Sequence, residues 1–326
     1  MPRSDLSGLV RKPSSLRHRH PVALAVLVFV VLAAINAALQ RRFLTVDVAV
    51  SNLGAFLPLA LAAIGQTYVI LGADIDLSNG AIVSLVNVVA VAVIESRGGA
   101  IAMGLIAGLA AGLVAGALNG LFVAYLRYQP IVATFATGVV FSGLALWILP
   151  QAGGQVPPDL AMAYAGSFLS VPTVAWILAG AGIMAALIVH LRFYRMLRAV
   201  GGNREAAFQT GLPVARTRMI AYALSGFFAA LSGLALVGET ASGDPLIGAG
   251  TTLSSITAVV LGGTALSGCV GGVLGSVLGA YILGLINNVI FFAHVPFAWQ
   301  GLIQGAIILA ALSGGVVMAR GSREWR

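Results

Sequence analysis

The side chains that could carry proton or ion chemistry in this chain are a small set of carboxylates. The chain has ten Asp and Glu residues in all. Only Asp74 and Asp76 lie in a break between two apolar stretches, whereas the others lie in tails, in loops or at the ends of such stretches. Ion-driven carriers place carboxylates within the membrane as proton relays or ion ligands. These two residues are therefore our candidates for proton coupling.

Residue patterns for other chemistry are missing from the sequence. The single lysine, Lys12, follows Arg11, so the chain has no Gly-Lys-Ser/Thr phosphate loop with which to hydrolyse ATP. The four histidines form no HExxH arrangement, and there is no GxSxG nucleophile motif. One cysteine, Cys269, excludes an internal disulfide and a Cys-rich metal site. We therefore expect no enzyme activity, no metal and no cofactor, and an energy source outside this chain.

Membrane helices must position these residues, because the composition excludes a water-soluble fold. Hydrophobic residues make up 59% of the chain, charged residues make up 9%, and the mean hydropathy is +1.00. A soluble domain carries about 25% charged residues. The sequence therefore excludes a soluble enzyme, a nucleic-acid-binding protein and a disordered chain, and it predicts a protein that lies in a lipid bilayer.

Ten apolar segments are candidate membrane spans, each of which needs about 20 mostly apolar residues. They are 21–39, 51–72, 80–96, 99–126, 130–149, 173–191, 219–238, 253–263, 271–293 and 298–318. The eighth is too short to cross alone, and 253–293 is alternatively one long span with a re-entrant piece. We predict an all-α polytopic membrane protein of about ten transmembrane helices, with two broken or re-entrant segments.

The basic residues predict the orientation. With ten spans and a cytoplasmic N-terminus, 15 of the 18 Lys and Arg residues fall in cytoplasmic segments, mainly the tails at 1–20 and 319–326 and the loop at 192–218. Membrane proteins carry such an excess of Lys and Arg on the cytoplasmic side. We therefore expect both termini in the cytoplasm, and the net charge of +8 requires no nucleic-acid partner.

One predicted span carries a row of glycines. They recur every four residues, as Gly104, Gly108, Gly112, Gly116 and Gly120. Residues four apart share a helix face, so this row predicts a smooth groove into which another helix packs closely. A helix that slides along its neighbour and a static close contact both fit the pattern.

The cytoplasmic segment at 192–218 contains signals for a short helix. Asn203 is suited to cap it, Glu205 favours its positively polarised N-terminus, and Gly211 is suited to end it. A short amphipathic helix between basic flanks can dock on another protein. An ordinary positively charged loop is the alternative interpretation.

Four stretches resemble the ribose/xylose/autoinducer-2 family of ABC importer permeases. They are AVGGNREAAFQTGLPV at 199–214, GQTYVILGADIDLSNG at 65–80, NGLFVAYLRYQPIVAT at 119–134 and AVVLGGTALSG at 258–268. The first is similar to the cytosolic coupling segment of the family, so the resemblance implies that five residues contact an ATPase. These residues are Asn203, Glu205, Ala206, Ala207 and Gly211. The chain departs from the family pattern at Ala73-Asp74, where the family has a glycine pair, at Asn79, and at Cys269-Val270.

The resemblance also implies partners and a domain organisation. Permeases of this family form a dimeric pore with a second copy or a related permease, within membrane lipid. A cytosolic ATP-binding subunit supplies the energy, and a periplasmic solute-binding protein delivers the substrate. The permease domain would then span 21–318, with a coupling loop at 192–218 and cytosolic tails at 1–20 and 319–326.

Polar residues in or beside the predicted spans are candidates for the translocation path. We select Gln66, Thr67, Asp74, Asp76, Ser78, Asn119, Asn287, Asn288 and Gln304. Hydrogen bonding between helices is the alternative role for each of them. The breaks at 74–80 and 262–272 share a Leu-Ser pair, and non-helical backbone at membrane depth is tolerated only inside protein or along a cavity.

The sequence thus predicts the translocation subunit of an ATP-driven importer. Its substrate would be a monosaccharide or a sugar-like polyol that crosses a bacterial inner membrane. An ion-coupled secondary carrier or a channel for a small polar solute is the alternative.

Overall fold

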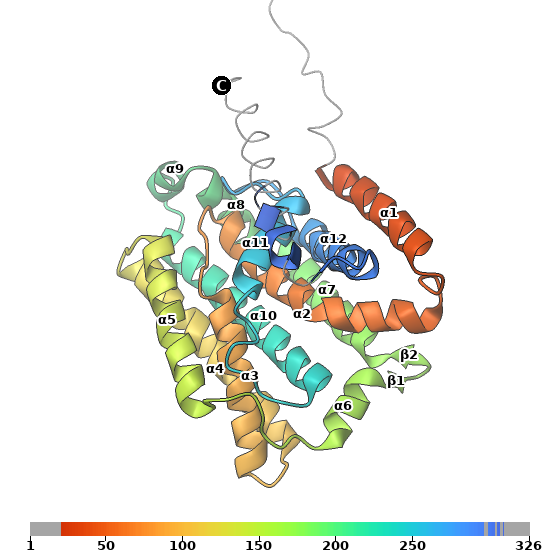
Figure 1. Cartoon of the computed structure of the whole chain (residues 1–326). Coiled ribbons are helices and arrows are strands. Elements are labelled where there is room, and N and C mark those ends of the chain that lie inside the picture. The colour runs from red at the N-terminus through yellow and green to blue at the C-terminus, as the bar shows by residue number, and fades with distance from the viewer. Residues whose placement is uncertain (1–20, 297–298, 304, 307–308, 310–326) are drawn as a thin grey trace, which may run out of the picture.

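The computed structural model describes residues 21–296, 299–303, 305–306 and 309, and these residues form an almost entirely helical bundle (Figure 1). In chain order the elements are α1 (Pro21–Leu39), α2 (Val46–Leu71), α3 (Asn79–Ser96), α4 (Ile101–Gly120), a π-helix η2 (Leu121–Tyr125), α5 (Pro130–Ile148), α6 (Pro158–Ala165), β1 (Ser167–Phe168), β2 (Val171–Pro172), α7 (Thr173–His190), α8 (Arg192–Gly202), α9 (Arg204–Gln209), α10 (Val214–Thr240), α11 (Thr251–Leu261) and α12 (Val273–Phe292). The prediction of an all-α polytopic membrane protein is confirmed.

Eight helices in the described part of the chain are long and apolar enough to cross a membrane: α1, α2, α3, α4 with η2, α5, α7, α10 and α12. The short segment at 253–263 forms α11, which has 11 residues and is too short to cross alone. The tenth predicted span, 298–318, lies largely outside the described residues. The predicted number of ten therefore stays a prediction.

Two predicted spans are longer than hydropathy indicated. Helix α2 begins at Val46 rather than at residue 51, and α10 begins at Val214 rather than at residue 219. Arg216 and Arg218 therefore lie in the first turns of α10, not in a loop. Hydropathy placed these arginines outside the span because it counts their charge, whereas a helix begins where the backbone hydrogen bonds begin.

Helix α10 lies at the centre of the bundle and packs against α2, α3 and α4. The glycines at 108, 112, 116 and 120 on α4 all face α10, whereas Gly104 faces α3. Gly226 on α10 lies opposite Gly112 and Gly116, so the backbones of the two helices are in direct contact. Small residues on both helices permit this close approach.

A proline in the middle of α2 leaves one carbonyl without its helical donor, and a side chain from another helix replaces that donor. Pro58 has no N–H with which to bond the carbonyl of Gly54, which lies one turn earlier. The hydroxyl of Tyr164 on α6 donates to this carbonyl instead, at 3.0 Å, and Ser232 on α10 donates to the carbonyl of Pro58 at 2.7 Å. The carbonyl that Pro58 leaves without its helical donor is thus satisfied by α6, and Ser232 adds a bond from α10 to the proline itself.

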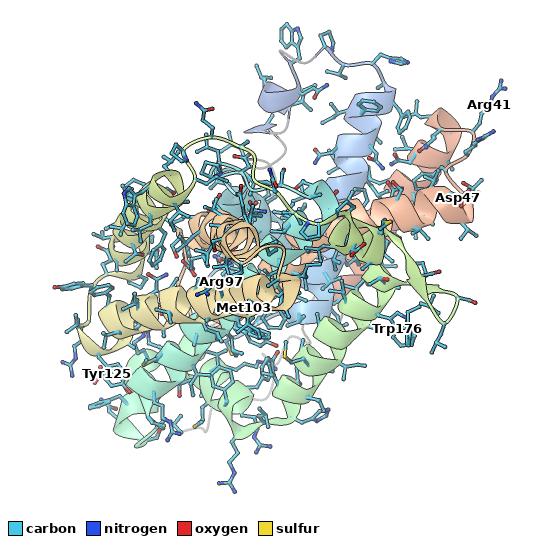
Figure 2. The ribbon with its side chains drawn as sticks, turned by 90° about the horizontal axis from the view of Figure 1, so that it is seen from below. Arg41, Asp47, Arg97, Met103, Tyr125 and Trp176 are labelled. Atoms are coloured by element: carbon cyan, nitrogen blue, oxygen red, sulfur yellow. The ribbon has the colours of Figure 1, made fainter. Side chains whose placement is uncertain are left out.

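Large apolar side chains cover the outside of the bundle. Exposed examples are Leu27 on α1, Phe135 on α5 and Ile183 on α7. In the view from below, Tyr125 and Trp176 also lie toward the periphery (Figure 2), and Met103 on α4 is exposed as well. Apolar exposure on several helices is what a surface surrounded by lipid requires, whereas a soluble protein avoids patches of this extent.

The segments α8 and α9 lie at one end of the bundle, and α6 with the β1–β2 hairpin lies at the opposite end (Figure 1). The hairpin is antiparallel, with Ser167 paired to Pro172 and Phe168 paired to Val171. The start of α1 lies at the same end as α8 and α9.

The glycine contact between α4 and α10 gives a first prediction. A Cβ at Gly112 would lie 2.6 Å from the Cβ of Ala230 and 2.7 Å from the carbonyl oxygen of Gly226. We expect Gly112→Ala to force the helices apart and to destabilise the protein by about 1–3 kcal/mol, the usual cost of over-packing. The measurement is the thermal unfolding temperature in detergent.

Gly143 on α5 is the matched control, because a Cβ there meets no atom within 4 Å. Gly143→Ala should leave the unfolding temperature unchanged or raise it slightly, since alanine favours helix. Equal unfolding temperatures for the two alanine variants would contradict the assignment of α4–α10 as a tight contact.

Candidate functional site

The chain leaves helical geometry between α2 and α3, at residues 72–78, which we call the first break. Gly72 ends α2, and Ala73 has the left-handed φ of 59°. The backbone N–H of Asp74 still bonds the carbonyl of Val69, at 3.2 Å. Because the break lies inside the bundle, its polar groups need partners from the surrounding helices.

Asp74 forms ion pairs with two arginines from different helices. Arg218 on α10 donates from Nε to Oδ2 at 2.8 Å and from Nη2 to Oδ1 at 3.1 Å. Arg204, the first residue of α9, donates from Nη2 to Oδ1 at 2.8 Å. Asp74 and Arg218 are buried, whereas the Arg204 side chain is 43% exposed. Arg218 also donates to the carbonyl of Val123 in η2, at 3.0 Å.

Asp76 makes a different set of contacts within the same break. Its Oδ1 accepts hydrogen bonds from the backbone N–H and the hydroxyl of Ser78, at 2.9 and 2.6 Å. Its Oδ2 accepts one from Ser225 on α10, at 2.9 Å. The carboxylate is fully buried, and its hydrogen-bond donors in the described structure are neutral. It therefore holds the turn into α3 against α10.

The remaining polar groups of the break are bonded to α4, α5 and α11. Asn119 on α4 donates to the Ser78 hydroxyl at 2.6 Å and accepts from Thr137 on α5 at 2.5 Å. The backbone N–H of Leu77 donates to Thr134 on α5 at 2.9 Å. At the start of α3, Gly80 donates to Thr252 on α11, also at 2.9 Å. The first break thus joins most of the bundle at one point.

A second break, residues 262–272 between α11 and α12, lies against the first. The backbone N–H of Cys269 donates to the carbonyl of Leu71 at 3.0 Å. Arg198 on α8 donates from Nε to the carbonyl of Cys269 at 2.7 Å. Gly201, also on α8, lies so close to the Leu71 carbonyl that no side chain could fit there. Helix α8 therefore packs directly on the point where the two breaks meet.

Helix α9 is a short capped helix beside this junction. The side-chain oxygen of Asn203 accepts from the backbone N–H of Ala206 at 3.0 Å, and Gly211 follows the helix with a φ of 80°. Glu205 accepts from Gln209 at 3.2 Å, within the helix. Ala206 is exposed, whereas Ala207 is buried. Phe208 is 66% exposed, so α9 presents an aromatic ring outward.

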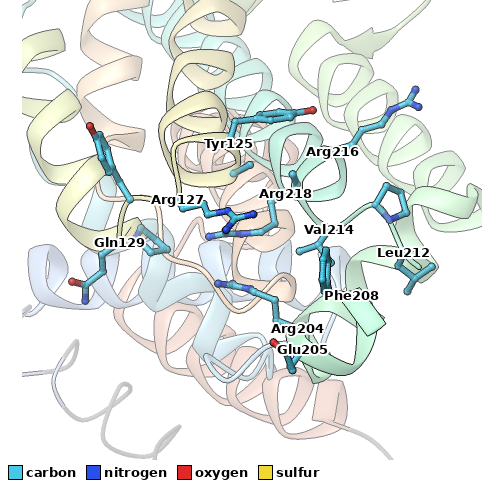
Figure 3. A pocket seen from close by; sticks show the side chains of 15 residues that line it. Tyr125, Arg127, Gln129, Arg204, Glu205, Phe208, Leu212, Val214, Arg216 and Arg218 are labelled. Atoms are coloured by element: carbon cyan, nitrogen blue, oxygen red, sulfur yellow. The ribbon is translucent and has the colours of Figure 1, made fainter. Parts of the chain in front are cut away.

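A cleft of about 810 Å³ separates α9 and the start of α10 from the loop that follows η2. Four arginines line it, with Glu205 as the one acidic lining residue in the described chain. Arg127, Arg204 and Arg218 point toward one another, and Arg216 points away (Figure 3). The surface beside α9 is therefore positively charged. Within the described residues, no three His, Cys, Asp or Glu side chains gather as metal ligands.

The other residues selected for a translocation path lie in different surroundings. Gln66 and Thr67 are fully buried, and Thr67 donates to Ser276 on α12 at 2.7 Å. Asn288 donates to Asn52 on α2 at 2.9 Å. Asn287 lines a hollow of about 370 Å³ between α2, the segment before α11, α11 itself and α12. Gln304 lies outside the described residues.

Comparison with known proteins identifies the family. The family model for the permease component of the branched-chain amino acid transport system matches residues 48–312. The ribose import permease protein of Bacillus subtilis (strain 168) is 38% identical over 256 residues, which are 77% of this chain and 79% of that protein.

Two Escherichia coli proteins match a larger share of the chain. The ribose import permease protein of strain K12 is 33% identical over 88% of this chain and 91% of its own length. The autoinducer 2 import system permease protein of strain K12 / DH10B is 32% identical over 88% and 84%. The chain belongs to this family of importer permeases.

Two arginines of the permease were missed as site residues by sequence reasoning. Arg204 and Arg218 lie 130 and 144 residues from Asp74, so local patterns gave no sign of the pairing. One signal was present, because a carboxylate in a break between two apolar spans requires a cation or hydrogen-bond donors when it is buried. Ser225 was missed for the same reason of sequence distance.

The contacts of Asp76 give the second prediction. Asp76→Leu should destabilise the permease by about 1–3 kcal/mol for each buried donor that it leaves without an acceptor. Asp76→Asn retains one carbonyl oxygen and should retain most of the stability. Thermal unfolding in detergent measures both, and Ser51→Ala, at an exposed position of α2, is the surface control. Asp76→Leu with the stability of the unsubstituted permease would contradict a structural role for this carboxylate.

Proposed function

We propose that this chain is the membrane-spanning subunit of an ATP-driven, binding-protein-dependent importer of the bacterial inner membrane. Its substrate would be a monosaccharide or a sugar-like polyol. The family assignment and the names of the relatives, which are ribose and autoinducer 2 import permeases, support the substrate class. The observation that carries the proposal is α9, a capped helix with an exposed aromatic ring, anchored to the break in the helix bundle.

The proposed partners occupy opposite ends of the bundle. A cytosolic ATP-binding subunit would dock on α9, and a periplasmic solute-binding protein would dock near α6 and the hairpin. The excess of arginines around α8 and α9 supports a cytosolic location for that end, since cytosolic segments are enriched in Lys and Arg. A second permease copy or a related permease would complete the pore.

For the translocation path, the local surroundings favour Asn287. Its side chain lines the hollow between α2, α11 and α12, together with the hydroxyl-bearing residues Thr251 and Ser254. A few polar groups in an apolar concave surface are what a small polar solute requires. Four other candidates are buried within one protomer: Gln66, Thr67, Ser78 and Asn119. The hydrogen bonds of Thr67, Ser78 and Asn119 support a role in holding the helices together.

An ion-coupled secondary carrier is the second candidate function, and Asp76 is the observation that favours it. The carboxylate is fully buried, and its hydrogen-bond partners in the described structure are neutral groups, as in a proton relay. Asp76→Asn cannot exchange a proton, so it distinguishes the two functions. Uptake that persists in Asp76→Asn and requires both partner subunits supports the importer. Uptake without them that collapses with the proton gradient supports the carrier.

The proposed orientation predicts the accessibility of single cysteines. In a Cys269→Ser background, Gln209→Cys on α9 should react with a membrane-impermeant thiol reagent only from the cytosolic side. Ser167→Cys in the hairpin should react only from the periplasmic side. Both native residues are exposed, so packing does not limit the reaction. Labelling of both cysteines from one side would contradict the topology.

The proposed docking of α9 predicts that its exposed ring is needed for coupling. Phe208→Ala removes an aromatic contact from a helix surface, where anchors of this kind dominate binding energy. We expect loss of the ATP-binding subunit on purification, or loss of substrate-stimulated ATP hydrolysis, with an unchanged unfolding temperature. Ile183→Ala on α7, also an exposed apolar residue and distant from both proposed docking surfaces, is the matched control and should retain both properties.

Two further α9 variants separate docking from local folding. Glu205→Ala removes one exposed side chain and should leave the permease folded. Gly211→Pro should disrupt the end of α9, because proline fixes φ near −65° and Gly211 has a φ of 80°. The three variants Phe208→Ala, Glu205→Ala and Gly211→Pro could all keep wild-type transport and wild-type ATPase stimulation. That result would contradict the docking role, and α9 would be an ordinary charged segment.

A further inference from the structure

The direct polar link between α9 and the helix breaks is an ion pair. Arg204, the first residue of α9, reaches Asp74 at 2.8 Å, whereas the other α9 side-chain bonds given by the structure stay within the segment 203–210. Asp74 lies three residues after the end of α2, in non-helical backbone. A displacement of α9 therefore has a direct polar route to the first break through this guanidinium, in addition to the packing of the adjoining α8.

Arg218 and Arg204 both bind the Asp74 carboxylate, but they differ in burial. The first pair stabilises the fold, and the second connects the break to α9. Arg218 binds both of its oxygens and is itself buried, so this pair compensates the buried charge. Arg204 adds one further bond from a side chain that is 43% exposed. Removal of Arg204 therefore leaves Asp74 with a bidentate cation partner, and the fold should persist.

The first break connects Asp74 to the interior over a short distance in the chain. Two residues after Asp74, Asp76 bonds Ser78 and Ser225, and Ser78 in turn accepts from Asn119. Arg218 carries a second connection, because its Nη1 bonds the carbonyl of Val123 in the π-helix η2. A movement at Asp74 thus reaches α10 and η2 through Arg218, and it reaches α4 through two residues of backbone and the hydrogen bonds of Asp76 and Ser78.

We propose that Asp74 is a positioning residue, which transmits the movement of α9 to the first break through its ion pair with Arg204. This inference rests on the proposed function, in which α9 is the element that contacts the ATP-binding subunit. In this proposal the Arg204–Asp74 distance changes when α9 moves, since Arg204 is half exposed on a short helix. The Arg218–Asp74 pair stays intact, since both of its side chains are buried inside the bundle. Chains of hydrogen bonds, ion pairs and packed side chains of this kind carry energetic coupling between distant sites.

The test uses the full importer complex reconstituted in liposomes with the binding protein and a transported sugar. Arg204→Gln should lower substrate-stimulated ATP hydrolysis and uptake by about fivefold or more, the lower range of allosteric coupling between sites. The ATP-binding subunit should remain bound, and the unfolding temperature should be unchanged. Arg204→Lys, which keeps the charge, should restore much of the stimulation.

Arg216→Gln is the matched control. Arg216 is an exposed arginine of the same cleft that points away from the other three, so its loss should leave stimulation and uptake unchanged. A reduction of equal size in Arg216→Gln would overturn the proposal, because it would reflect the net charge of the cleft. Wild-type stimulation in Arg204→Gln would overturn it as well.

A double-mutant comparison assigns the effect to the pair. Asp74→Asn should reduce stimulation and also lower the unfolding temperature, because it leaves the buried Arg218 without its charged partner. In protein that remains folded, adding Arg204→Gln to Asp74→Asn should reduce stimulation no further, since contacting residues are non-additive. Additive losses would overturn the proposal. If Phe208→Ala abolishes stimulation while Arg204→Gln retains it, α9 remains the docking element and only the transmission through Asp74 is wrong. If both retain it, the proposed function of α9 fails too.

Discussion

Non-helical backbone inside an apolar helix bundle must find a partner for each buried peptide group and charge, and the rest of this structure depends on that requirement. Residues 72–78 meet it with side chains from α4, α5 and α10 and with their own carboxylates. Once these partners are fixed, the helices that carry them are fixed too. The hydrogen bonds of one break therefore set the relative positions of helices that are distant in the sequence.

Close packing and hydrogen bonding both hold α4 and α10 in place, at different residues. Helices α4 and α10 meet through glycine, where the gain is van der Waals contact and no polar group is needed. The same two helices also carry Asn119 and Ser225, which bond the first break. The glycine contact brings the helices near enough for these short polar side chains to reach, so the two kinds of interaction depend on each other.

Local sequence signals were sufficient for much of the fold but not for the pairing of side chains. The apolar segments predicted the spanning helices of the described chain, and α11 was recognised as too short to cross. Hydropathy failed at Arg218, because it cannot register that a buried carboxylate 144 residues away compensates the charge. The contact between Cys269 and Leu71 was equally invisible, since the two breaks share a Leu-Ser pair but no spacing that indicates proximity. The start and end of α9, at Asn203 and Gly211, could be predicted because capping and left-handed backbone depend on neighbouring residues alone.

Hydrogen bonds from other segments hold helix α2 at two points along its length. In its middle, Tyr164 supplies the hydrogen bond that Pro58 cannot make, and at its end Cys269 bonds the Leu71 carbonyl. Apart from the half-buried Leu59, residues 56–71 are buried, so this part of the helix has little freedom to bend. It therefore behaves as a rigid helix that contacts α6 near its middle and the junction of α8 with the two breaks at its end. A displacement at either end of the bundle would be transmitted along this helix to the opposite end.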